Sequence, residues 1–259
     1  MQKYIRFIQS QFSSLTVYRV EAYGRWIMAL FSALSYYFIW KLTSTSNADN
    51  HKLLVYFILY WGFLSALTSG KTAYFIAKDI RSGEINNYLV KPINYFVTLI
   101  LRGLAPVVFR IIIPSILLIV VMFIYPNIFL PTSPINLFLF LFSLVYCFLI
   151  WNFIMIIIGS IAFMGTEIRS LLTVFDLIIN LVRGAYIPAY LFPTWLTKIL
   201  FFTFIPYIST FSIELYQVSK SASYVISAFT VATLWLLILY IVAIKTFQKG
   251  LRYYESNGS

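Results

Sequence analysis

No charged residue occurs between Ile111 and Thr166, a stretch too long to cross a lipid bilayer as one helix. Pro126, Pro131 and Pro134 interrupt the stretch near its middle, where they disfavour a continuous helix. In the whole chain only 10% of residues are charged and 61% are hydrophobic, so a soluble fold would lack the polar side chains needed to cover its core. The stretch therefore predicts two membrane-spanning helices joined by a tight turn.

Four further apolar segments have nearly the length that a membrane-spanning helix needs. They are Trp26 to Trp40, Leu53 to Gly70, about Ser170 to Ile187, and Ser221 to Ile244. The sequence thus predicts an all-α integral membrane protein with six transmembrane helices, which form a single domain over residues 1–259.

Residues 1–20 fit a helix that lies on the membrane surface better than a cleaved signal peptide. Apolar residues recur there at helical spacing, at Ile5, Ile8, Phe12 and Leu15. Basic residues lie nearby, which favours an amphipathic interfacial helix on the inner leaflet. A plain helical extension of the first span is the alternative.

Residues 184–220, between the fifth and sixth predicted spans, are apolar but contain no continuous run of spanning length. Gly184, Pro188, Pro193 and Pro206 interrupt them. We expect two short re-entrant half-helices that enter the membrane from its outer side and return, with their broken backbone covered by protein or facing a cavity. An interfacial loop is the alternative.

The distribution of basic residues predicts the orientation. The chain carries 19 Lys and Arg against 8 Asp and Glu. With the N-terminus inside, only Lys41, Lys52, Lys198 and Lys220 fall in outer segments, and Arg183 falls within a span. Because cytoplasmic loops concentrate Lys and Arg, we expect a multi-pass protein of the cell (inner) membrane with both termini cytoplasmic, including a tail over residues 245–259. This orientation accounts for the excess of basic residues, so the charge does not imply that nucleic acid is a partner.

The cytoplasmic segment of residues 71–102 is the most informative part of the sequence. It is longer than a plain connection needs, and its polar residues concentrate between Ala77 and Pro92. Because a helix usually ends before a proline, we expect a short helix that ends before Pro92. Ile85 and Leu89 would form its apolar stripe.

We expect the charged residues of this loop to face water or a soluble partner. These residues are Asp79, Arg81, Glu84 and Lys91. On physical grounds alone the loop is either a docking element or a solvated connection.

The order of residues in the loop resembles the cytoplasmic signature of type-two ATP-binding-cassette (ABC) permeases. An acid, a base, a glycine, an apolar residue and a proline carry the resemblance, at Asp79, Arg81, Gly83, Leu89 and Pro92. The fuller pattern, Ile80-Arg-Ser-Gly-Glu84 and Tyr88-Leu-Val-Lys-Pro92, is similar to a branch of small six-span permeases. The segment from Gly184 to Pro206 is similar to the family's outer re-entrant stretch, and the ending Lys249 to Ser256 resembles the cytoplasmic tail of that branch.

The resemblance implies the permease subunit of an ABC exporter. It implies a coupling helix in the loop that docks on a separate ATPase subunit, through Asp79, Arg81, Gly83, Glu84, Leu89 and Pro92. It also implies a dimer, with a second copy or a related permease, whose interface forms the substrate pathway. ATP and Mg²⁺ would bind to the ATPase, and this chain itself would bind no cofactor.

Few residues could support catalysis or metal binding by this chain. It has one cysteine, Cys147, and one histidine, His51, so we expect neither an active site nor a metal site. Ser69-Gly-Lys-Thr72 ends like a phosphate-binding loop, but Ser65 stands where its first glycine is needed.

The alternative function is a non-transporting sensor or immunity component that binds a soluble partner through the cytoplasmic loop of residues 71–102.

Asp176 and Arg183 are charges within the predicted fifth span. A charge at the bilayer centre costs about 2.5–3.5 kcal/mol on insertion scales, so it usually faces a bundle interior or a cavity. The two residues lie seven apart and share a helix face. They line a dimer interface or substrate path, or reach toward opposite membrane surfaces, or form a structural pair.

Overall fold

The computed structural model describes residues 19–43, 47–69, 71–90, 94–165 and 167–257, and every regular element in these ranges is helical. The elements are α2 (Arg19–Lys41), α3 (Asn47–Leu59), the π-helical turn η2 (Tyr60–Leu64), α4 (Ser65–Leu67), α5 (Thr72–Arg81), α6 (Glu84–Val90), α7 (Tyr95–Ile124), α8 (Pro126–Phe129), α9 (Pro134–Gly159), the 3-10 turn η3 (Ser160–Met164), α10 (Ile168–Val182), η4 (Ala189–Leu191), α11 (Thr194–Phe201), η5 (Pro206–Ile208), α12 (Thr210–Gln217) and α13 (Ala222–Asn257). The all-α prediction is confirmed for these residues. The predicted interfacial helix falls on residues 1–18, outside the described residues, except for its last two positions, which begin α2.

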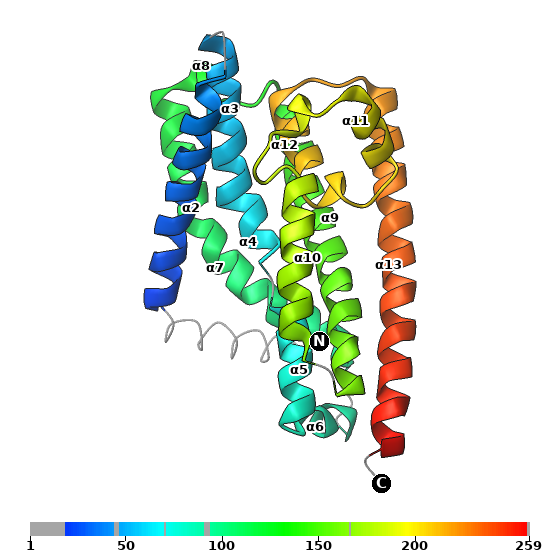
Figure 1. Ribbon diagram of the computed structural model, residues 1–259. Helices are drawn as coiled ribbons and strands as arrows, with labels where there is room; N and C mark the ends of the chain where they lie inside the picture. Colours follow the sequence, from blue (N-terminus) through cyan, green and yellow to red (C-terminus); the bar gives the residue numbers. More distant parts are fainter. Residues whose placement is uncertain (1–18, 44–46, 70, 91–93, 166, 258–259) are drawn as a thin grey trace.

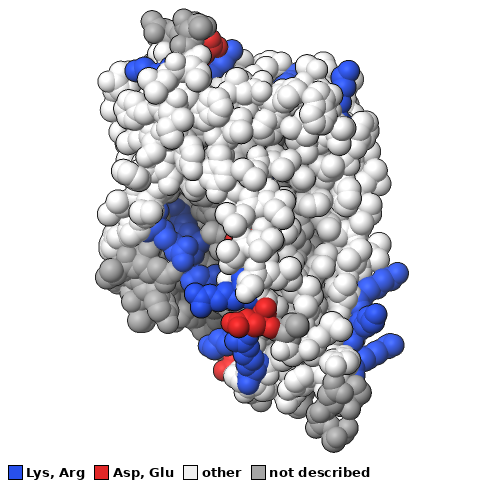
Figure 2. Space-filling model, viewed as in Figure 1, with Lys and Arg blue, Asp and Glu red and all other residues white. Residues whose placement is uncertain are grey.

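The helices form an elongated bundle (Figure 1). One end carries α6 and the C-terminal end of α13, and the opposite end carries α8, α11 and α12. Helix α9 lies in the core, where it packs against α5, α12 and α13. Its Ile150 and Ile156 are fully buried. On the face that Figure 2 shows, the wide middle of the bundle is almost free of charge, apart from one hollow, and Lys and Arg gather toward the end that carries α6.

Four segments of the described residues are long and apolar enough to cross a membrane. They are Asp49–Arg81, Tyr95–Ile124, Pro134–Met164 and Ala222–Tyr254. They correspond to the predicted second, third, fourth and sixth spans. The predicted break between the third and fourth spans is also present, because α7 ends at Ile124 and α9 begins at Pro134. The connection is longer than the tight turn we predicted, since it contains the short helix α8. The chain is thus a multi-pass membrane protein by the length and composition of its helices.

The predicted first and fifth spans correspond to α2 and α10, which also run along the bundle (Figure 1). Neither helix is both long enough and apolar enough to count among the four candidate membrane spans. Helix α10 has 15 residues and is therefore about 22 Å long, shorter than the hydrocarbon core of a bilayer. The uncharged part of α2 lies between Arg25 and Lys41 and includes several tyrosine and serine residues. Six membrane crossings therefore stay a prediction.

Residues 184–217 form a compact layer of short helices at the end of the bundle opposite α6 (Figure 1). Pro188 and Pro193 precede η4 and α11, and Pro206 begins η5. Hydrogen bonds tie the layer to α2 and to the short helix α8: Trp40 Nε1 donates to the Tyr186 carbonyl at 2.7 Å, and Tyr216 Oη donates to the Phe129 carbonyl at 2.6 Å. The layer contains four short helical elements where we predicted two half-helices, and its entry into a membrane stays a prediction.

Gly184 is required where α10 gives way to this layer. Its φ is +85°, which side chains other than glycine rarely adopt. Tyr56 Oη donates to the Gly184 carbonyl at 2.8 Å, and a Cβ at position 184 would lie 2.3 Å from that oxygen of Tyr56. Both the backbone and the packing therefore exclude a larger residue.

We expect Gly184→Ala to destabilise the protein by about 2–4 kcal/mol, from the left-handed backbone and the clash together. Melting temperature in mild detergent measures the effect. Gly165→Ala is the control for the backbone alone, because Gly165 also has a positive φ, of 75°, but open space around it. Equal losses for the two variants would contradict the packing argument.

Candidate functional site

Helices α5 and α6 form a hairpin at one end of the bundle, which we call the coupling hairpin (residues 72–90). Its turn is Ser82–Gly83, where Gly83 adopts a φ of +71° and Ser82 Oγ accepts a hydrogen bond from the Glu84 amide at 3.4 Å. The predicted short helix is present as α6. Lys91 and Pro92 lie outside the described residues, as does the side chain of Leu89.

The sequence led us to expect that Asp79 faces water or a soluble partner, but in the structure it does neither. Its side chain is 0% exposed. The prediction was wrong because α5 buries the face that carries Thr72, Ile76 and Asp79, which recur at helical spacing. An ionised carboxylate buried in this way needs a cation and hydrogen-bond donors.

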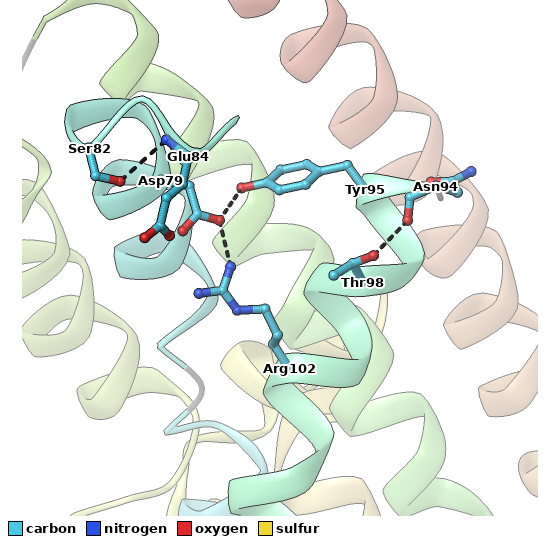
Figure 3. Close-up of polar contacts among 7 residues, drawn as sticks. All are labelled: Asp79, Ser82, Glu84, Asn94, Tyr95, Thr98 and Arg102. Atoms are coloured by element: carbon cyan, nitrogen blue, oxygen red, sulfur yellow. Dashed lines mark hydrogen bonds and ion pairs between the residues drawn. The ribbon is translucent and has the colours of Figure 1, made fainter. Parts of the chain in front are cut away.

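Two side chains from α7 supply them, as Figure 3 shows. Arg102 Nη1 lies 2.5 Å from Asp79 Oδ2 in a salt bridge, and Tyr95 Oη donates to the same oxygen at 2.9 Å. The Arg102 guanidinium also lies over the ring of Phe75 on α5, 4.6 Å from its centroid. We call Asp79, Arg102 and Tyr95 the buried triad. It joins the coupling hairpin to the first turns of α7.

Helix α6 packs onto the triad from the other side. Ile85 is fully buried, in agreement with the predicted apolar stripe. The Tyr88 ring contacts the Tyr95 ring, with centroids 5.2 Å apart. Burial raises the pKa of the Tyr88 phenol, so this group stays neutral beside the ion pair.

Helix α5 is also fixed to α9. Thr72 Oγ1 donates to Asn152 Oδ1 at 2.7 Å, and both side chains are fully buried. A Cβ at Gly159 would lie 2.9 Å from the Ala73 Cα, so the two helices touch by their backbones. Thr72, the last residue of the motif that resembles a phosphate-binding loop, therefore serves helix packing.

Aromatic rings connect the buried triad to α13. Tyr95 stacks on Phe247 of α13, with ring centroids 5.4 Å apart. Phe247 contacts Phe163 of η3 at 5.3 Å, and Gly250 leaves room for that ring. The coupling hairpin thus contacts α7 and α9, and Tyr95 of α7 connects it to α13.

Removing one member of the buried ion pair should cost more than removing both charges. We expect Arg102→Leu to destabilise the protein by about 3–5 kcal/mol, because Asp79 would remain buried and unpaired. The double variant Asp79→Asn with Arg102→Leu should regain part of this loss, since the amide oxygen can still accept from Tyr95. Melting temperatures in detergent test the pair, and additive losses in the double variant would contradict it.

The outer surface of the coupling hairpin is charged. Arg81 and Glu84 are exposed, as predicted. Beside them lies a groove of about 620 Å³ between α5 and the start of α10. Charged side chains line it, namely Lys78, Arg81, Glu167 and Arg169. Basic and acidic groups alternate at this end of Figure 2, which suits a protein partner with a mixed charge pattern.

Asp176 and Arg183 lie away from the hairpin, in the wall of one cavity. No ion pair joins them to each other or to another described residue. Arg183 is 7% exposed, so it does not reach to the outer surface. The cavity also receives Arg25 from α2 and Arg110 from α7.

Sequence reasoning missed Arg102 and Tyr95 as partners of Asp79. A signal was present, because Tyr95, Leu99 and Arg102 share one face of α7 and Leu99 is an apolar residue that a buried face would carry. An arginine on such a face needs an acid nearby.

A family model described as ABC-2 family transporter protein matches residues 27–258 of the chain. The match includes the coupling hairpin, the buried triad and all of α10. No individually curated protein matches the sequence.

Proposed function

The chain belongs to the ABC-2 family of transporter proteins, and from this premise we propose that it is the permease subunit of an ABC exporter. Family membership implies a membrane component without catalytic activity of its own and an ATPase partner. In our proposal a separate subunit binds and hydrolyses ATP with Mg²⁺. Two permeases, identical or related, form the substrate pathway.

The coupling hairpin is the observation that carries this proposal. It presents exposed charges and a groove of about 620 Å³ at one end of the bundle. It is also fixed to the long helices by a buried ion pair and by the Thr72–Asn152 hydrogen bond. A hairpin that contacted only water would not need to be fixed to the long helices in this way.

The proposed mechanism is a rigid-body movement. When the ATPase subunits close, the hairpin moves with the subunit it contacts. The Asp79–Arg102 salt bridge transmits the movement to α7, and the Tyr95–Phe247 contact transmits it to α13. Tilting of these helices would convert an inward-facing pathway into an outward-facing one.

The orientation of the chain forms part of the proposal. The end that carries α6 also carries exposed Lys245, Lys249 and Arg252 of α13. Because positive charge favours the cytoplasmic side, we assign this end to the cytoplasm. The ATPase would then meet the hairpin where ATP is available.

Charge reversal on the exposed hairpin should weaken ATPase binding. We expect Arg81→Glu and Glu84→Lys each to reduce the ABC ATPase that co-purifies with the tagged protein by about tenfold, because each reversal places like charges together. Mass spectrometry of the complex from native membranes measures the ratio.

Lys198→Glu is the matched control, since Lys198 is exposed on α11 at the opposite end. This variant should keep the ATPase, and all three variants should insert normally because the changed side chains are exposed. Unchanged ATPase recovery with both hairpin reversals would reject the docking assignment. A wild-type preparation with no ABC ATPase would favour the non-transporting function.

A further inference from the structure

A cavity of about 80 Å³ lies in the layer of short helices, at the end of the bundle opposite α6 (Figure 1). The lining residues that the structure describes all lie between Val182 and Tyr224, within the continuous range 167–257. The volume is larger than one water molecule needs and smaller than a drug-sized site. The cavity therefore suits a small ligand or one end of a larger one.

Aromatic rings form much of the cavity wall. Five aromatic side chains line it, namely Phe192, Phe201, Tyr207, Phe211 and Tyr224. Contacts hold some of these rings in place: the Phe201 and Tyr224 ring centroids lie 5.7 Å apart, and Tyr207 Oη donates to the Phe201 carbonyl at 2.7 Å. Because the face of an aromatic ring carries partial negative charge, such a wall favours a cation over an anion.

Glu214 of α12 is the charged residue among the described lining residues. Its Oε2 accepts a hydrogen bond from Tyr224 Oη at 3.2 Å. No described residue donates a hydrogen bond to its other oxygen, Oε1. Since an ionised carboxylate can accept several hydrogen bonds, Glu214 keeps the capacity to accept from a ligand that carries N–H groups.

The chain itself places one ammonium group against this carboxylate. Lys220 Nζ lies 3.4 Å from Glu214 Oε2 and 5.0 Å from the centroid of the Tyr224 ring. Lys220 is not among the lining residues, so its ammonium group lies beside the cavity and not inside it. One carboxylate and one aromatic ring thus contact the same primary ammonium group, which shows how the site can hold such a cation.

The internal ion pair is weak enough to be exchanged. The side chains of Lys220 and Glu214 are 31% and 34% exposed, and ion pairs in contact with water contribute little to stability. Their distance of 3.4 Å is also longer than the value of about 2.7–2.9 Å for a strong charge-assisted hydrogen bond. A free ammonium ion that entered the cavity could therefore replace Lys220 at Glu214.

We propose that this cavity binds a small primary alkylammonium group, with Lys220 as the internal competitor. The N–H groups of the ligand bond to Glu214, and its carbon atoms lie against the aromatic rings. The site shares no residue with the coupling hairpin, so this inference goes beyond the proposed function and does not depend on it.

The test is the affinity of the full-length protein in nanodiscs for n-butylammonium, which corresponds to the side chain of lysine. Saturation-transfer NMR in an amine-free buffer of constant ionic strength measures the dissociation constant, and empty nanodiscs give the background. We expect Glu214→Gln to bind n-butylammonium about tenfold more weakly, because the amide keeps the shape but loses the charge-assisted hydrogen bond. Butan-1-ol, a neutral analogue, should not distinguish the variant from the wild type.

Lys220→Gln should act in the opposite direction and raise the affinity about threefold, because it removes the internal competitor. Lys198→Gln is the matched control, since Lys198 is exposed on α11 in the same layer but does not line the cavity. It removes the same charge, so it measures any gain that comes from weaker long-range repulsion alone.

Equal affinity of the wild type and Glu214→Gln for n-butylammonium would overturn the inference. Equal affinities of Lys220→Gln and Lys198→Gln would overturn it as well, because Lys220 would then not compete at Glu214. If Glu214→Gln lowers the melting temperature, the comparison of the two lysine variants carries the test. Neither result would change the ATPase co-purification experiment, because the binding assay contains no ATPase.

Discussion

The salt bridge between Asp79 and Arg102 is the interaction on which the proposed mechanism depends. It lies where the coupling hairpin meets α7, and it is largely shielded from water, because the side chain of Asp79 is 0% exposed and that of Arg102 is 11% exposed. An ion pair in an apolar setting fixes geometry more than it adds stability, since both charges lose their hydration. In the proposed mechanism it joins a surface hairpin to long helices, so that a force on the hairpin would become a movement of the bundle.

Much of the fold could be predicted from where charges are missing. The uncharged segments indicated the positions of the long helices, and the prolines near position 130 marked the turn between α7 and α9. Helix α10 was harder, because Gly184 ends it through its positive φ and leaves it with 15 residues. Hydropathy could not reveal this early end, since the residues that follow are also apolar.

The coupling hairpin was recognised from its residue order, but its chemistry was only half predicted. Polar residues in a cytoplasmic loop suggest exposure, and this held for Arg81 and Glu84. Asp79 differs because the helical period of α5 places it beside Ile76 on the buried face. The surroundings of Asp176 and Arg183 likewise depend on tertiary placement, because both residues line a cavity to which several separate helices contribute.

The proposed mechanism requires α6 to contact the ATPase subunit in the assembled transporter. Photo-cross-linking from Asn86, an exposed residue of α6, tests this contact most directly. Ser223, exposed at the start of α13 at the opposite end, is the matched control position. We expect a cross-link to an ABC ATPase from Asn86 and none from Ser223. A cross-link from Ser223 alone, or from neither position in a complex that contains the ATPase, would contradict the mechanism.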